Sequence, residues 1–112
     1  MSARRVARPS SLPKPTFEEL WVEDADGHAL CALVNGDRGW LMYLRFEGDA
    51  GFSSRNPSYR GDPDAQLEYR LNNGQQDWYP ASWSLPIAEV RRALDYFAKE
   101  RKQPPFITWH ED

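Results

Sequence analysis

The sequence predicts an α+β fold: a mostly antiparallel β-sheet with one main C-terminal helix packed on one face. Short apolar or alternating runs, separated by Gly, Asn and Asp, fill positions 18–80, and this pattern is typical of antiparallel strands. Apolar residues with helical spacing follow at 85–101, and two prolines then precede a short apolar run at 106–109. A chain of 112 residues suits one domain, which we expect to span residues 16–112.

Turn signals separate the first predicted strands. Residues 18–24 alternate, with Trp21 on the same side as two glutamates, which predicts a strand or an edge segment. An Asp-Gly pair at 26–27 predicts a hairpin turn before the apolar run at 29–34. An Asn-Gly pair at 35–36 is a second hairpin signal, although the spacing to the next apolar run predicts a longer loop there.

The run at 40–47 is the best candidate for a central strand. It combines aromatic and aliphatic residues, and only Arg45 and Glu47 are charged, so we expect both of its faces to be at least partly covered. Residues 48–64 contain three Gly, two Pro and many small polar residues. They predict a long loop with a short strand around Phe52, and loops of this length often carry function.

A hairpin is predicted after this loop. Residues 65–71 alternate cleanly between apolar and polar side chains, and Asn-Asn-Gly at 72–74 predicts the turn. The returning strand lies in residues 75–81 and ends near Pro80.

The one strong helix pattern covers residues 85–101. We expect Ser84 or Leu85 at its N-cap and Pro86 in its first turn, where the missing N–H costs nothing. The acidic residue of the first turn and the basic residues of the last turn suit the helix dipole. The apolar positions on one face are Pro86, Val90, Ala93, Leu94 and Phe97.

The chain ends with a predicted short strand. Pro104 and Pro105 terminate the helix, and residues 106–109 form the strand. Chain ends fray unless they are held, so we expect Trp109 to be buried and to pin the terminus. Loss of a buried aromatic side chain at this position would cost about 3–5 kcal/mol.

The charge is unevenly distributed. The net charge is −3, but residues 1–15 hold four basic residues and no acidic one. The rest of the chain therefore has ten basic and 17 acidic residues, a net charge of −7. We expect residues 1–15 to form a disordered or extended basic arm, rich in Pro and Ser. The acidic body disfavours nucleic acid and favours basic partners.

The single cysteine and the absence of long apolar runs predict a soluble, cytoplasmic protein. Cys31 lies in an apolar run, where a buried, unreactive side chain is expected. One cysteine forms no intrachain disulfide, which fits a reducing compartment. No run approaches the roughly 18 apolar residues of a membrane span, and no apolar stretch follows the N-terminal arginines as in a secretory signal.

No catalytic, cofactor-binding or metal-binding motif stands out, so we expect no enzyme activity, no cofactor and no metal. His28 and His110 are far apart in sequence and lack metal-ligand spacing. The segment Asp24–His28 resembles half of an EF-hand loop, but the twelfth position is Asn35 instead of glutamate. No nucleotide-binding or nucleophile motif is present.

The second half resembles immunity protein family 1 of bacterial polymorphic toxin systems. The resemblance is carried by "VRRALDYFAKERKQPPFITWHED" and, upstream, by "GWLMYLRFEGDAGFSSRNP" and "EYRLNNGQQDWYPASWSLP". It spans about residues 29–112 and leaves the N-terminal arm outside. Its most specific part is the helix, the proline and the near-terminal tryptophan, which correspond here to Val90, Ala93, Phe97, Pro105, Ile107 and Trp109.

The resemblance implies a small cytoplasmic α+β protein that binds and neutralises a cognate toxin, often a nucleic-acid deaminase, by occlusion and not by catalysis. The shared residues look structural, so no contact residue carries over. Aromatic, arginine and charged residues in and next to the long loop are our candidates for partner binding. They are Glu47, Asp49, Phe52, Arg55, Tyr59, Arg60, Asp62 and Asp64.

A second hypothesis belongs to a different class. The arm at Arg4, Arg5 and Arg8 would serve a small nucleic-acid-binding or regulatory module. Deleting residues 1–15 separates the two hypotheses, because only the second predicts that binding is lost. The sequence leaves the oligomeric state open.

Overall fold

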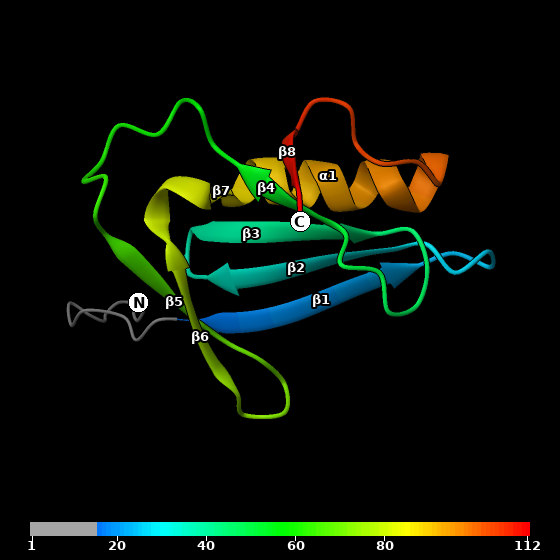
Figure 1. Ribbon diagram of the computed structural model, residues 1–112, viewed down its shortest axis with the longest axis horizontal. Helices are drawn as coiled ribbons and strands as arrows, with labels where there is room; N and C mark the ends of the chain where they lie inside the picture. The colour runs from blue at the N-terminus through cyan, green and yellow to red at the C-terminus, as the bar shows by residue number, and fades with distance from the viewer. Residues whose placement is uncertain (1–15) are drawn as a thin grey trace, which may run out of the picture.

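The computed structural model describes residues 16–112, so the predicted basic arm at 1–15 lies outside the described residues. Within them, the main sheet consists of β1 (Phe17–Glu23), β2 (Ala29–Asn35), β3 (Arg38–Leu44), β4 (Phe52–Arg55), β7 (Leu85–Pro86) and β8 (Thr108–Glu111). The strand order is β1-β2-β3-β4-β8, with β7 also paired to β3, and every pairing is antiparallel. Helix α1 (Ile87–Glu100) lies along the sheet (Figure 1). These observations confirm the predicted α+β class.

A separate hairpin covers the other face of the main sheet. It consists of β5 (Gln66–Arg70) and β6 (Gln76–Pro80), and the short 3-10 helix η2 (Ala81–Trp83) follows it. Figure 1 shows β5 and β6 running across the direction of β1, β2 and β3 at one end of the sheet. The Asn35 side-chain amide donates to the Glu68 carbonyl at 2.9 Å, which joins the hairpin to the sheet.

The β2–β3 connection is tighter than predicted. Asn35 pairs directly with Arg38, so only two residues form the turn. Gly36 has φ +62°, a conformation that glycine adopts without strain. The prediction of a longer loop was therefore wrong, and β3 begins at Arg38 instead of Trp40. It also ends at Leu44, three residues before the predicted end at 47.

Strand β2 is buried on both faces because the sheet is covered on both sides. On the α1 side, Leu30 and Ala32 pack with Val90 and Phe97 in the larger core cluster. On the hairpin side, a second cluster contains Cys31, Leu33, Trp40 and Tyr69. A strand covered on both faces has a continuous apolar sequence instead of an alternating one, which explains the run at 29–34.

The helix begins later than predicted. Pro86 occupies the N-cap, so Ser84 and Leu85 do not cap the helix. The residue before a proline is disfavoured in the helical conformation, and Leu85–Pro86 instead pairs with β3 as β7. The first helical N–H, that of Ile87, donates to the Asp37 carbonyl at 2.8 Å. The β2–β3 turn therefore provides an acceptor for one of the N–H groups that the first turn of the helix leaves without a partner.

The final strand forms, although two residues later than predicted. It pairs with β4, and Trp109 lies opposite Ser54. The Trp109 side chain is half-buried against the larger core, and its Nε1–H donates to the Pro104 carbonyl at 2.8 Å. Ile107, which is 5% exposed, is the more deeply buried residue of this segment.

In residues 16–112, no helix has the length and apolar character needed to cross a membrane.

Replacing Trp109 by Ala is expected to lower the free energy of unfolding by about 3 kcal/mol, the low end for a tryptophan truncation, because the ring is only half-buried. Chemical denaturation measures this loss. Trp109→Phe retains most of the ring packing and loses the hydrogen bond to Pro104, so we expect it to cost about 1 kcal/mol. A loss below about 1 kcal/mol for Trp109→Ala would show that the ring does not hold the terminus.

Candidate functional site

The predicted partner-binding residues do not form one surface. Strand β4 divides the predicted long loop, so residues 45–51 and residues 56–65 leave opposite ends of this strand (Figure 1). Glu47 and Asp49 belong to the first loop, whereas Phe52 and Arg55 lie on β4 itself. The other four predicted residues lie in the second loop: Tyr59, Arg60, Asp62 and Asp64.

Asp49 and Phe52 hold the first loop in place. Arg45 donates from Nε and Nη2 to Asp49 Oδ2 and Oδ1, each at 2.8 Å. The Asp49 side chain is only 4% exposed, and the Arg45 guanidinium lies 5.0 Å from the centre of the Phe52 ring. Hydrogen bonds from the Arg45 side chain and backbone hold the pKa of Asp49 well below its usual range. Both residues face inward and leave little surface for a partner.

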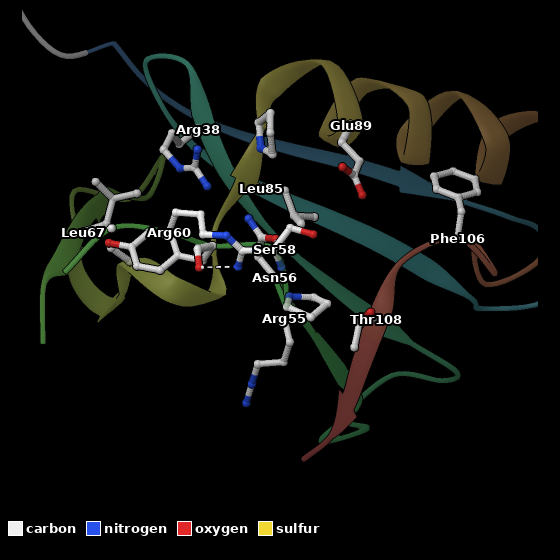
Figure 2. Close-up of a pocket in the computed structure, with 15 residues that line it drawn as sticks. Arg38, Arg55, Asn56, Ser58, Arg60, Leu67, Leu85, Glu89, Phe106 and Thr108 are labelled. Atoms are coloured by element: carbon white, nitrogen blue, oxygen red, sulfur yellow. Dashed lines mark hydrogen bonds between the residues drawn. The ribbon is translucent and has the colours of Figure 1, made fainter. Parts of the chain in front are cut away.

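The second loop borders a cavity of about 620 Å³, which we call the arginine pocket and which Figure 2 shows. In this view Arg38 and Arg60 lie on one side, and Glu89 and Phe106 lie on the other. Its lining includes Arg38, Arg55, Asn56, Tyr59, Arg60, Glu89 and Phe106. The pocket is thus mainly cationic on one side.

Ser84 organises the arginine pocket. The Arg38 guanidinium donates from Nε to Ser84 Oγ at 2.7 Å and from Nη2 to the Ser84 carbonyl at 2.8 Å. Asn56 Nδ2 donates to the same carbonyl at 2.9 Å. Ser84 Oγ in turn donates to the Ala81 carbonyl at 2.6 Å. Sequence reasoning missed Arg38 and Asn56, because no local pattern connects them with Ser84.

Arg55 contributes its stem to the arginine pocket, whereas its charged end is used elsewhere. The guanidinium lies 3.7 Å from the centre of the Trp83 ring, and Nη1 donates to Ser53 Oγ and to the Ser54 carbonyl, each at 2.9 Å. Figure 2 shows the Arg55 side chain directed away from Arg38 and Arg60. Burial lowers the pKa of Arg55 from its ordinary value, and the charge of Asp112 opposes this effect.

A second cavity, of about 490 Å³, lies between the β1–β2 turn and the first loop; we call it the aromatic groove. Trp21 and Phe46 line it and are 45% and 55% exposed. Of the predicted residues, only Glu47 lines this groove. The aromatic, acidic and histidine residues that line the groove are Trp21, Glu23, Asp24, His28, Phe46 and Glu47. In the sequence, Trp21 lies on the same side of an alternating strand as two glutamates, and this position could have indicated that its side chain is exposed.

Residues 3–111 match the family described as Immunity protein Imm1. The chain belongs to this family. The match begins at residue 3, so the resemblance includes the N-terminal arm, which we had placed outside it. No curated protein matches the chain. Membership in an immunity protein family implies a toxin partner that the protein neutralises, and such families are generally non-enzymatic.

Three potential metal ligands of this Imm1 protein lie together in the β1–β2 turn. One ligand atom each of Asp24, Asp26 and His28 lies within 4.8 Å of the others. Asp24 Oδ1 accepts from the backbone N–H groups of Asp26 at 2.8 Å and His28 at 3.0 Å, and Oδ2 lies 3.0 Å from His28 Nδ1. Although burial raises the pKa of Asp24, these hydrogen bonds lower it overall. Turn geometry accounts for the proximity of the three residues.

Cys31 has the environment of a structural residue. Its side chain is 3% exposed in the cluster under the β5–β6 hairpin. Burial raises the pKa of its thiol to about 12, and the nearby charge of Glu19 adds to the shift. The thiolate, which is the reactive form, is therefore scarce at neutral pH. The structure confirms that Cys31 is buried, as expected.

Replacing Asp49 by Asn is expected to lower the stability of this Imm1 protein in a pH-dependent way. Because the pKa of Asp49 is lowered in the folded state, its ionised form stabilises the fold above the unfolded-state pKa of about 3.9. The difference from wild type is therefore full at pH 7 and shrinks as the pH falls below about 4. Chemical denaturation at pH 7 and pH 3 measures both differences. Asp64→Asn removes the same charge at an exposed carboxylate and should change stability at pH 7 by less than about 0.5 kcal/mol. An equal deficit of Asp49→Asn at both pH values contradicts the assignment.

Replacing Ser84 by Ala is expected to cost about 1–3 kcal/mol of unfolding free energy, because it removes the acceptor of a half-buried, charged donor. Ser84 is fully buried, and its hydroxyl bonds both Arg38 and Ala81. Urea denaturation measures the loss, with Ser58→Ala on the exposed loop as the control. Equal stability of the two variants would show that the Ser84 hydroxyl does not hold the pocket together.

Proposed function

We propose that this Imm1 protein neutralises a cognate bacterial toxin that acts on nucleic acid, such as a deaminase of a polymorphic toxin system, by covering the toxin's active site. The observation that carries the proposal is the family match along residues 3–111. The charge supports it, because the chain after residue 15 has a net charge of −7. Enzymes that act on nucleic acid present basic clefts, and an acidic inhibitor is steered towards them.

The proposed action needs binding and no catalysis. An inhibitor that occupies the cleft excludes the substrate as long as the complex persists, so affinity and residence time determine protection. We place this action in the cytoplasm, where the nucleic-acid substrates of such a toxin lie. A bacterial cell that makes the immunity protein would then tolerate the toxin.

The predicted contact residues differ in how well they suit a partner. Glu47 and Arg60 are exposed, and we retain them as proposed contacts. Asp62 and Asp64 are also exposed, although Asp62 Oδ1 accepts from the Asp64 N–H at 2.9 Å. Tyr59 is half-buried, and its hydroxyl donates to the Asp62 carbonyl at 3.1 Å.

The test is co-expression with the toxin domain encoded beside this protein. We expect restored growth, a stable complex with a catalytically inactive toxin, and loss of toxin activity on its nucleic-acid substrate when the purified proteins are mixed. An excess of substrate should slow formation of the complex if the cleft is the shared site. Failure to restore growth together with failure to form a complex contradicts the proposal.

A variant lacking residues 1–15 distinguishes the alternative function. Under the proposed function, it retains toxin binding, because the contact surfaces belong to residues 16–112. If the chain were a nucleic-acid-binding module that uses its arm, the full-length protein would bind nucleic acid and the shortened one would not.

A further inference from the structure

We propose that the aromatic groove receives a basic segment of the toxin, with a lysine or arginine side chain lying against Trp21 and Phe46 between Glu23 and Glu47. This proposal rests on the proposed function and adds the surface and the chemistry of the contact. The groove is formed by residues distant in sequence: Trp21 and Glu23 come from β1, and Phe46 and Glu47 from the loop after β3.

Exposed aromatic residues distinguish this surface. Among residues 16–112, three large hydrophobic side chains are exposed: Trp21, Phe46 and Trp78. Two of the three line the aromatic groove. Water-exposed tryptophan and phenylalanine in a concave surface are typical of contact sites, and aromatic residues often contribute most of the binding energy.

The charge of the groove selects a basic partner. Among residues 16–112, three carboxylates line it, those of Glu23, Asp24 and Glu47, and no lysine or arginine does. The Arg45 guanidinium lies 5.8 Å from the centre of the Phe46 ring, but its charge is paired with Asp49. The Asp24 carboxylate is used by the β1–β2 turn and by His28, which leaves Glu23 and Glu47 exposed on the two sides. A cation placed between them also meets the faces of aromatic rings, and cation–π attraction adds to the ion pairs.

Both walls of the groove are held in place before binding. Trp21 Nε1 donates to Glu19 Oε2 at 2.7 Å, which fixes the indole. The Arg45–Asp49 pair closes the loop that carries Phe46 and Glu47. Groups that are already ordered lose less entropy when a partner binds. The groove is therefore suited to tight binding despite its small size.

The arginine pocket does not compete for the same basic segment. Its lining includes Arg38 and Arg60, whose charges repel such a segment. The two cavities thus differ in the sign of their charge, and the proposed nucleic-acid-acting toxin matches the aromatic groove.

The experiment measures affinity for the catalytically inactive toxin domain by isothermal titration calorimetry. Trp21→Ala and Phe46→Ala should each weaken binding by at least about 10-fold, as expected for aromatic residues at the centre of an interface. Glu23→Lys/Glu47→Lys should weaken it by at least about 100-fold, because it places like charges against the partner. All of these residues are exposed, so circular dichroism should show a wild-type fold.

Two matched controls separate local contact from general effects. Trp78→Ala removes a tryptophan that is 55% exposed on β6, outside the groove. Asp95→Lys/Glu100→Lys on α1 changes the net charge by the same four units as the groove double variant. Both controls should bind within about 3-fold of wild type, because surface substitutions outside an interface have small effects.

The outcomes separate this inference from the proposed function. If wild type binds the toxin and the groove variants bind equally well, the inference is wrong and the proposed function stands. If wild type neither binds nor protects, both are wrong. If Phe46→Ala turns a dimer into a monomer without weakening toxin binding, the groove joins two copies of this chain. If deleting residues 1–15 and substituting Trp21 both strengthen toxin binding, the chain's own arm occupies the groove. Each of these last two results, the loss of a dimer and the stronger toxin binding, overturns the inference.

Discussion

The hydrogen bonds around Ser84 are the constraint on which the remaining architecture depends. The chain reaches Ser84 from the hairpin that covers one face of the sheet and leaves it as the helix that covers the other. Directly after Ser84, Leu85–Pro86 pairs with Arg38 and Gly39 at the start of β3, whereas β4 pairs with the later part of β3. Arg38 and Asn56 both donate to Ser84. One buried serine therefore holds the segment before β7 and one wall of the arginine pocket together.

Covering the sheet on both faces separates the scaffold from the contact surface. The hairpin is short and spans one end of its face, where Tyr69 is buried and Tyr79 stacks 4.5 Å from Trp40. Trp21 lies on the same face, and among residues 16–112 it is left 45% exposed. Exposed apolar surface on a sheet is unfavourable in water, and the proposed toxin would cover it.

Local patterns predicted most of the fold, and contacts between distant residues account for the errors. The alternating runs at 18–24 and 65–71 and the helix at 85–101 depend on neighbouring side chains, and each forms close to its predicted position. The predicted helix start was wrong because Leu85–Pro86 pairs with the distant strand β3, and Asp37, 50 residues before Ile87, accepts from the first helical N–H. The hydrogen bonds from Arg38 to Ser84 join residues 46 positions apart, so no local sequence pattern predicts them. Of the residues that line the aromatic groove, the sequence analysis had named only Glu47 as a candidate contact, and it did not foresee the burial of Asp49, which depends on Arg45.

The groove residues can vary without disturbing the core. Trp21, Glu23, Phe46 and Glu47 belong to neither buried cluster, and their substitution leaves the packing of β2 and α1 unchanged. An immunity protein must match one particular toxin, and specificity is a difference of affinities that changes with the contact residues. A rigid sheet with a groove whose residues lie outside the core meets both requirements. In the proposed complex, the aromatic side chains would supply affinity, and the carboxylates beside them would select the charge of the toxin.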